Sequence, residues 1–141
     1  MGDICKRFKF LLGAAILFGL FGVGQSFGAA APGLTRTHSG GGVTVKVTYL
    51  NPQEAEDTRF QVVLDTHSAN LDSYDLKNLS LLRDDAGQSY QATKVENKGS
   101  GHHREVILIF PKPSAGAKRL ELVIQDIAKV KERSFSWDFS Q

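Results

Sequence analysis

Residues 43–49 read VTVKVTY, in which apolar and polar side chains alternate. Because successive side chains of a β-strand point to opposite faces, this pattern predicts a strand with one buried face. Similar alternation recurs at 60–64, 120–124 and 135–139. The continuous apolar run 106–110 predicts a central strand covered on both faces.

Two further apolar segments, 79–82 and 90–95, flank the sequence DDAG at 84–87, which is typical of a hairpin turn. The chain therefore has about seven short strands separated by turn signals. The segment 127–133 is the only helical candidate, and it is too short to alter the fold class. We predict an all-β fold, an antiparallel immunoglobulin-like β-sandwich of about seven strands.

The N-terminal residues 1–30 are typical of a signal peptide. Lys6, Arg7 and Lys9 precede the uncharged and mostly apolar run 10–24. This run is shorter than the roughly 20 apolar residues that a membrane-spanning helix needs. We therefore expect a cleaved leader and a secreted or periplasmic protein. If the leader is retained instead, the chain is an envelope-anchored stalk domain.

The boundaries that follow from this leader divide the chain into three parts. Small residues allow cleavage after Gly28 or Ala30. Residues 31–42, which end in the run SGGG, are expected to form a flexible linker rich in glycine and proline. The β-sandwich domain is predicted to occupy residues 43–141.

The leader also accounts for the formal net charge of +2. It holds three of the 17 basic and one of the 15 acidic side chains, so the remainder is neutral. We therefore expect no nucleic-acid partner. The only cysteine, Cys5, lies in the leader, so the exported domain has no disulfide and depends on its hydrophobic core. Lack of a thiolate beyond the leader also excludes a blue-copper site.

Histidines provide the candidate metal site. Asp65 and His67 are two residues apart and so share one face of a strand, while His102 and His103 open the central strand. The hypothesis is a copper or zinc site with the three histidines as ligands and Asp65 as a ligand or as the hydrogen-bond partner of one. Against it, adjacent histidines in extended chain point to opposite faces, and Arg104 would place a positive charge beside the cation.

Nucleophilic catalysis is not expected. Asp65, His67 and Ser68 are the residue types of a hydrolase triad, but residues strung along one strand end cannot hydrogen-bond in series. Beyond residue 30 the chain lacks a Gly-x-Ser-x-Gly motif. The aromatic residues at 135, 137 and 139 are expected to fill the core, because a binding platform would leave only serines to do so. We therefore predict no enzyme activity and no cofactor.

Several short motifs occur together along the chain: DTHS at 65–68, LRDD at 82–85 and HHR at 102–104. In this combination the chain resembles a group of uncharacterised exported bacterial proteins that are predicted to form small β-sandwiches. The resemblance implies the fold and the export. It implies no activity and no catalytic residue.

These observations favour an exported, non-enzymatic β-sandwich module with a binding or structural role in the cell envelope. Such a module presents loops at the ends of its sandwich. Its partner is expected to be an envelope protein or a ligand, and a membrane only if the leader is retained. The alternative is a protein that binds a transition metal, copper or zinc, through the histidine cluster.

Overall fold

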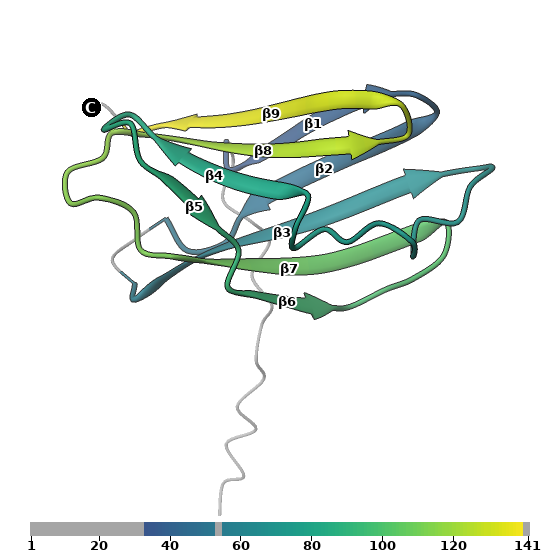
Figure 1. Ribbon diagram of the computed structural model, residues 1–141, viewed down its shortest axis with the longest axis horizontal. Coiled ribbons are helices and arrows are strands. Elements are labelled where there is room, and N and C mark those ends of the chain that lie inside the picture. Colours follow the sequence, from purple (N-terminus) through teal and green to yellow (C-terminus); the bar gives the residue numbers. More distant parts are fainter. Residues whose placement is uncertain (1–32, 53–54, 140–141) are drawn as a thin grey trace, which may run out of the picture.

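Two antiparallel β-sheets packed face to face make up the structure, a computed structural model that describes residues 33–52 and 55–139 (Figure 1). No helix occurs in these two ranges. The five-stranded sheet has the order β1 (Thr35–Gly40), β2 (Val43–Tyr49), β3 (Asp57–Thr66), β7 (His103–Pro111) and β6 (Lys94–Asn97). The four-stranded sheet has the order β5 (Ser89–Gln91), β4 (Ser80–Asp84), β8 (Arg119–Ile127) and β9 (Val130–Asp138).

The connectivity is that of an immunoglobulin-like sandwich. The order β2-β3-β7-β6 corresponds to strands A-B-E-D of such folds, and β4-β8-β9 corresponds to C-F-G. Strand β5 extends the second sheet beside β4, and β1 adds an edge strand beside β2. The predicted fold class is therefore confirmed.

The core lies between the two sheets and contains a cluster of aromatic rings. Trp137 of β9 packs against Phe60 and Tyr49 of the opposite sheet, with ring centroids 5.0 and 6.0 Å apart. Phe60 also meets Phe110 edge-on, at 6.0 Å. Trp137 is 1% exposed, and its indole nitrogen donates a hydrogen bond of 2.8 Å to the Leu34 carbonyl. Because aromatic residues bury large areas, this cluster is a major contact between the sheets.

The structure has nine strands in its described part, not about seven, and the first of them corrects the predicted linker. Residues 35–40 form β1, which pairs with β2 along its whole length, from Thr35 opposite Thr48 to Gly40 opposite Val43. The segment reads TRTHSG and has no apolar alternation. Backbone hydrogen bonding to β2, rather than burial of its own side chains, therefore holds this strand in place.

Two other local expectations are also corrected. The segment 90–95 is split into β5 and β6, because the chain crosses there from one sheet to the other. The helical candidate 127–133 contains the last residue of β8, a two-residue turn at 128–129 and the first four residues of β9. Asp126, Ala128 and Lys129 have φ values of 54°, 50° and 63°, which turn the chain sharply enough to join β8 to β9.

A buried arginine joins the β1–β2 turn to the β8–β9 turn. Arg133 is fully buried and donates hydrogen bonds of 2.7 Å to the carbonyls of Ile127 and Gly40. Its Nε atom has no partner in the described part of the chain, and burial lowers the pKa of Arg133. The two turns also lie against each other at Gly41. There is no room for a side chain there, because an added Cβ atom would lie only 2.0 Å from the Ala128 carbonyl oxygen.

We expect Gly41→Ala to destabilise the protein more than Gly42→Ala. Both glycines have positive φ, 63° and 78°, so each substitution pays the cost of about 1–2 kcal/mol for a left-handed alanine. Only Gly41 would also collide with Ala128, because nothing lies within 4 Å of a Cβ at Gly42. Urea unfolding of the two variants measures the difference, and equal losses of stability would contradict the turn-to-turn contact.

Candidate functional site

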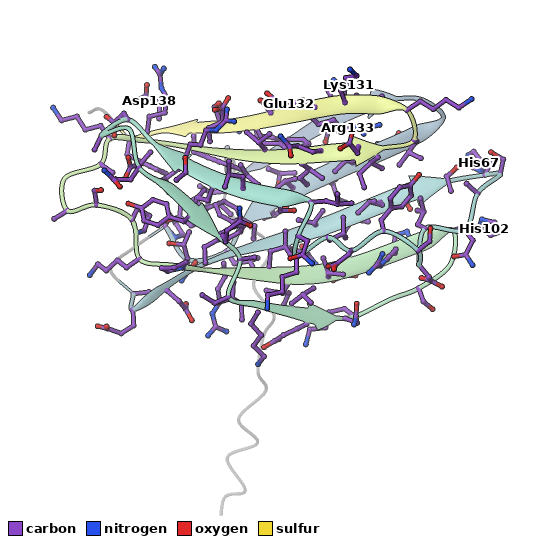
Figure 2. All side chains as sticks on the ribbon, in the orientation of Figure 1. His67, His102, Lys131, Glu132, Arg133 and Asp138 are labelled. Carbon is purple, nitrogen blue, oxygen red and sulfur yellow. The ribbon has the colours of Figure 1, made fainter. Side chains whose placement is uncertain are left out.

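The predicted histidine residues lie at one end of the sandwich, where β3 ends and β7 begins. Asp65 is directly opposite His103 in the sheet, and Nδ1 of His103 donates a hydrogen bond to the Asp65 carboxylate. His102 precedes the strand, and its Nδ1 donates to the Ala69 carbonyl at 2.7 Å. His67 is exposed at the same end, as Figure 2 shows.

The structure therefore brings Asp65 and His103 together but does not assemble the whole predicted set. Over residues 33–52 and 55–139, no group of three or more His, Cys, Asp or Glu side chains could hold a metal ion. Arg104, which the sequence placed beside the proposed cation, is buried. Arg104 faces the interior opposite Leu64, and its guanidinium donates to the Leu71 and Tyr74 carbonyls at 2.7 and 2.5 Å.

A cleft of about 390 Å³ opens at the opposite end of the sandwich. The described residues on either side of positions 53–54 form one wall, and residues 112–117 of the β7–β8 loop, at the left in Figure 1, form the other. Its lining residues are Tyr49, Asn51, Pro52, Ala55, Asp57, Thr58, Lys112, Pro113, Ser114, Ala115, Gly116, Ala117, Leu120 and Phe139. Loops at a sandwich end are common positions for binding residues, because the rigid sheets hold them in place.

Two aromatic rings form the apolar side of this cleft. Tyr49 ends β2, and its ring meets that of Phe139 edge-on, with centroids 5.8 Å apart. Phe139 is 38% exposed, which corrects the expectation that the aromatic residues of the last strand all lie in the core. Phe135 and Trp137 are buried as expected. Burial raises the pKa of Tyr49, so its hydroxyl stays protonated near neutral pH.

An ion pair fixes the β2–β3 side of the cleft. The Arg59 guanidinium binds the Asp57 carboxylate through two hydrogen bonds of 2.9 and 2.8 Å. These bonds from Arg59 are the main reason that the pKa of Asp57 is lowered. Asn51 joins them, because its side-chain oxygen accepts from the Arg59 amide and its nitrogen donates to the Asp57 carbonyl.

A network around Asp84 fixes the β7–β8 side. Tyr90 donates to one Asp84 carboxylate oxygen at 2.7 Å, and the Ser114 hydroxyl lies 3.0 Å from the Tyr90 oxygen. The other oxygen accepts from the amides of Ala86 and Gln88. Burial alone raises the pKa of Asp84, but hydrogen bonds from Ser114, Tyr90 and backbone amides outweigh it and hold the pKa far below the ordinary range.

The cleft was missed at the sequence level. Phe139 continues the alternation of Phe135 and Trp137, so its pattern is that of a core residue. The position of Phe139 in the chain could have indicated its exposure, since it follows the last residue of β9, where the sandwich ends.

Comparisons with protein-family models, with curated proteins and with solved structures found no match to this chain. In the described part of the chain, no helix has the length and apolar character needed to cross a membrane.

We expect Asp84→Asn to lower the free energy of unfolding at neutral pH by about 1–3 kcal/mol, because buried donors lose a charged acceptor. Since the folded pKa of Asp84 is depressed, its carboxylate stabilises the fold above the ordinary aspartate pKa of about 4, and this contribution is lost as pH falls further. The difference in the free energy of unfolding between wild type and variant should therefore become smaller below about pH 4.

Urea unfolding of both proteins across this pH range measures the difference. Asp126→Asn is the matched control, because Asp126 is exposed and has φ of 54°, a conformation that asparagine tolerates. A difference that stays constant down to strongly acid pH would contradict the role assigned to the Asp84 carboxylate.

Proposed function

We propose that this protein is an exported, non-enzymatic β-sandwich module that binds a small ligand in the cleft between its β2–β3 and β7–β8 loops. The features of its N-terminal 30 residues support export. Its immunoglobulin-like connectivity supports a module whose rigid sheets present loops for recognition. The cell envelope is the proposed place of action.

One observation carries the proposal: an aromatic ring is left exposed where it lines a concave site. Phe139 and Leu50 are the exposed large hydrophobic residues of the described part, and both lie at the cleft end. Phe139 lines the cleft, whereas Leu50 adjoins it without lining it. Ligand sites are typically clefts of about 300–1,000 Å³ that combine aromatic side chains with a few polar groups. This cleft fits that description.

The polar groups of the cleft favour binding over catalysis. The Ser114 hydroxyl hydrogen-bonds to Tyr90, which donates to the Asp84 carboxylate. A general base works best when its pKa is near the working pH, and the pKa of Asp84 is far below it. Ser114 therefore has no effective base in this network, and the network serves to position the loop.

NMR titration of the isotope-labelled protein with hydrocinnamyl alcohol, a neutral phenyl compound, tests the proposal. We expect saturable shifts confined to the backbone amides of the cleft loops, because the ring should pack against Tyr49 and Phe139. Phe139→Ala should weaken these shifts, whereas Leu50→Ala, which removes an equally exposed side chain outside the cleft, should not. Shifts that do not saturate, or that map to the histidine end, would sink the proposal.

Copper or zinc binding at the histidine end is a second candidate function, and one feature favours it. His102 and His103 both use Nδ1 as a donor, to a carbonyl and to a carboxylate. When imidazole is neutral, this leaves Nε2 with its lone pair. Histidine ligands of metals commonly have their other ring nitrogen hydrogen-bonded in this way.

Metal titration followed by melting temperature tests this second candidate. A ligand that binds only the folded state raises the melting temperature by mass action, so Cu(II) or Zn(II) in excess should raise it. His103→Ala should abolish the rise, and His38→Ala, which changes a histidine of β1, should leave it. A rise of equal size in His103→Ala, or no rise in wild type, would remove the candidate.

A further inference from the structure

We propose that the ligand of the end cleft is a small aromatic organic anion, with its ring packed against Phe139 and the edge of Tyr49 and its carboxylate near Lys112. This inference rests on the proposed function and adds the chemical class of the ligand. It follows from the distribution of charge and of free hydrogen-bond donors along the lining of the cleft.

Positive charge in the described lining of the cleft has no counterion among the described residues. Two charged side chains belong to this described lining, Asp57 and Lys112. Asp57 is already neutralised by the two hydrogen bonds from Arg59. Lys112 is exposed and has no ion pair within the described ranges of the chain. Within the described lining, Lys112 is therefore an ammonium group without an ion-pair partner, and this favours an anionic ligand.

The same loop offers neutral donors beside this ammonium group. Ala115 and Gly116 line the cleft, and their amides make no hydrogen bond to the described parts of the chain. Gly116 has φ of 79°. Consecutive free amides next to a residue of positive φ are typical of small anion-binding turns. The Asp84 network reaches this loop through Ser114, whose amide donates to Tyr90 at 2.9 Å, and so holds it against the sheet.

The opposite wall is suited to a ring. Tyr49 and Phe139 meet edge-on, and Phe139 is the more exposed of the two. A ligand ring can pack against the exposed Phe139 ring in the offset or edge-on arrangement that aromatic pairs prefer. Leu120 and Pro52 extend this apolar surface. With about 390 Å³ in total, the cleft suits one ring with a short carboxylate arm.

The experiment compares three probes that share one skeleton and differ in charge: hydrocinnamate, its alcohol and its amine. Dissociation constants come from NMR titration of the whole protein at low and high ionic strength. We expect hydrocinnamate to bind about three- to fivefold more tightly than the alcohol at low salt, as for a partly exposed ion pair. The amine should bind more weakly than the alcohol, and added salt should reduce the preference for the anion.

Two lysine variants locate the charge. Lys112→Gln should remove most of the preference for hydrocinnamate and leave the affinity for the alcohol nearly unchanged. Lys46→Gln is the matched control, because Lys46 is an exposed lysine of β2 that does not line the cleft. The Lys46→Gln variant has the same change of net charge and should still bind hydrocinnamate more tightly than the alcohol.

The outcomes separate this inference from the proposed function. If the alcohol binds in the cleft but hydrocinnamate binds no more tightly, the ligand class is wrong while the binding site stands. Equal loss of preference in both lysine variants would also overturn the inference, because it would reflect net charge rather than Lys112. If none of the three probes binds in the cleft, the proposed function itself fails.

Discussion

The structure depends on packing that holds two β-sheets together without a disulfide. The only cysteine of the chain is Cys5, so no sulfur bridge links the sheets in the described domain. Aromatic packing takes this role, with Trp137 of one sheet against Phe60 and Tyr49 of the other. The cluster continues from Tyr49 to Phe139, where it reaches solvent. The apolar wall of the cleft is therefore the outer edge of the same packing that joins the sheets.

The two ends of the sandwich differ because buried arginines close one of them. Arg133 donates to carbonyls of the β1–β2 and β8–β9 turns, and Arg104 donates to carbonyls of the β3–β4 loop. Both side chains bring charge into the interior, which is tolerated when carbonyl oxygens accept from the guanidinium. At the other end the residues on the β2–β3 side bond among themselves through Asp57 and Arg59, and the β7–β8 loop is held to β4 and β5 through Asp84 and Tyr90. A cleft is left between them.

Alternation of side chains was enough to predict the fold class, since it follows directly from burial of one strand face. It could not predict β1, whose polar residues are held by backbone pairing to β2. It also could not predict the turn at Ala128, because left-handed φ at a residue other than glycine leaves no pattern in the sequence. At the histidine end, strand register explains why Asp65 meets His103. At the cleft end, Phe139 continues the alternation of the buried residues of β9, and it is exposed because it lies beyond the end of that strand.

Most charged groups near the two ends already have structural partners, and this limits what each end can do. Asp65 accepts from His103, Asp57 from Arg59, and Asp84 from Tyr90, so these carboxylates are occupied in the folded protein. The hydrogen bonds lower the pKa of Asp57 and of Asp84, so these two carboxylates at the cleft end are weak bases. Among the described lining residues, the charged group left without an ion-pair partner is the ammonium of Lys112, which lines the same cleft as the exposed ring of Phe139. Recognition of a complementary anion uses both groups as they stand, without breaking any bond that holds the loops.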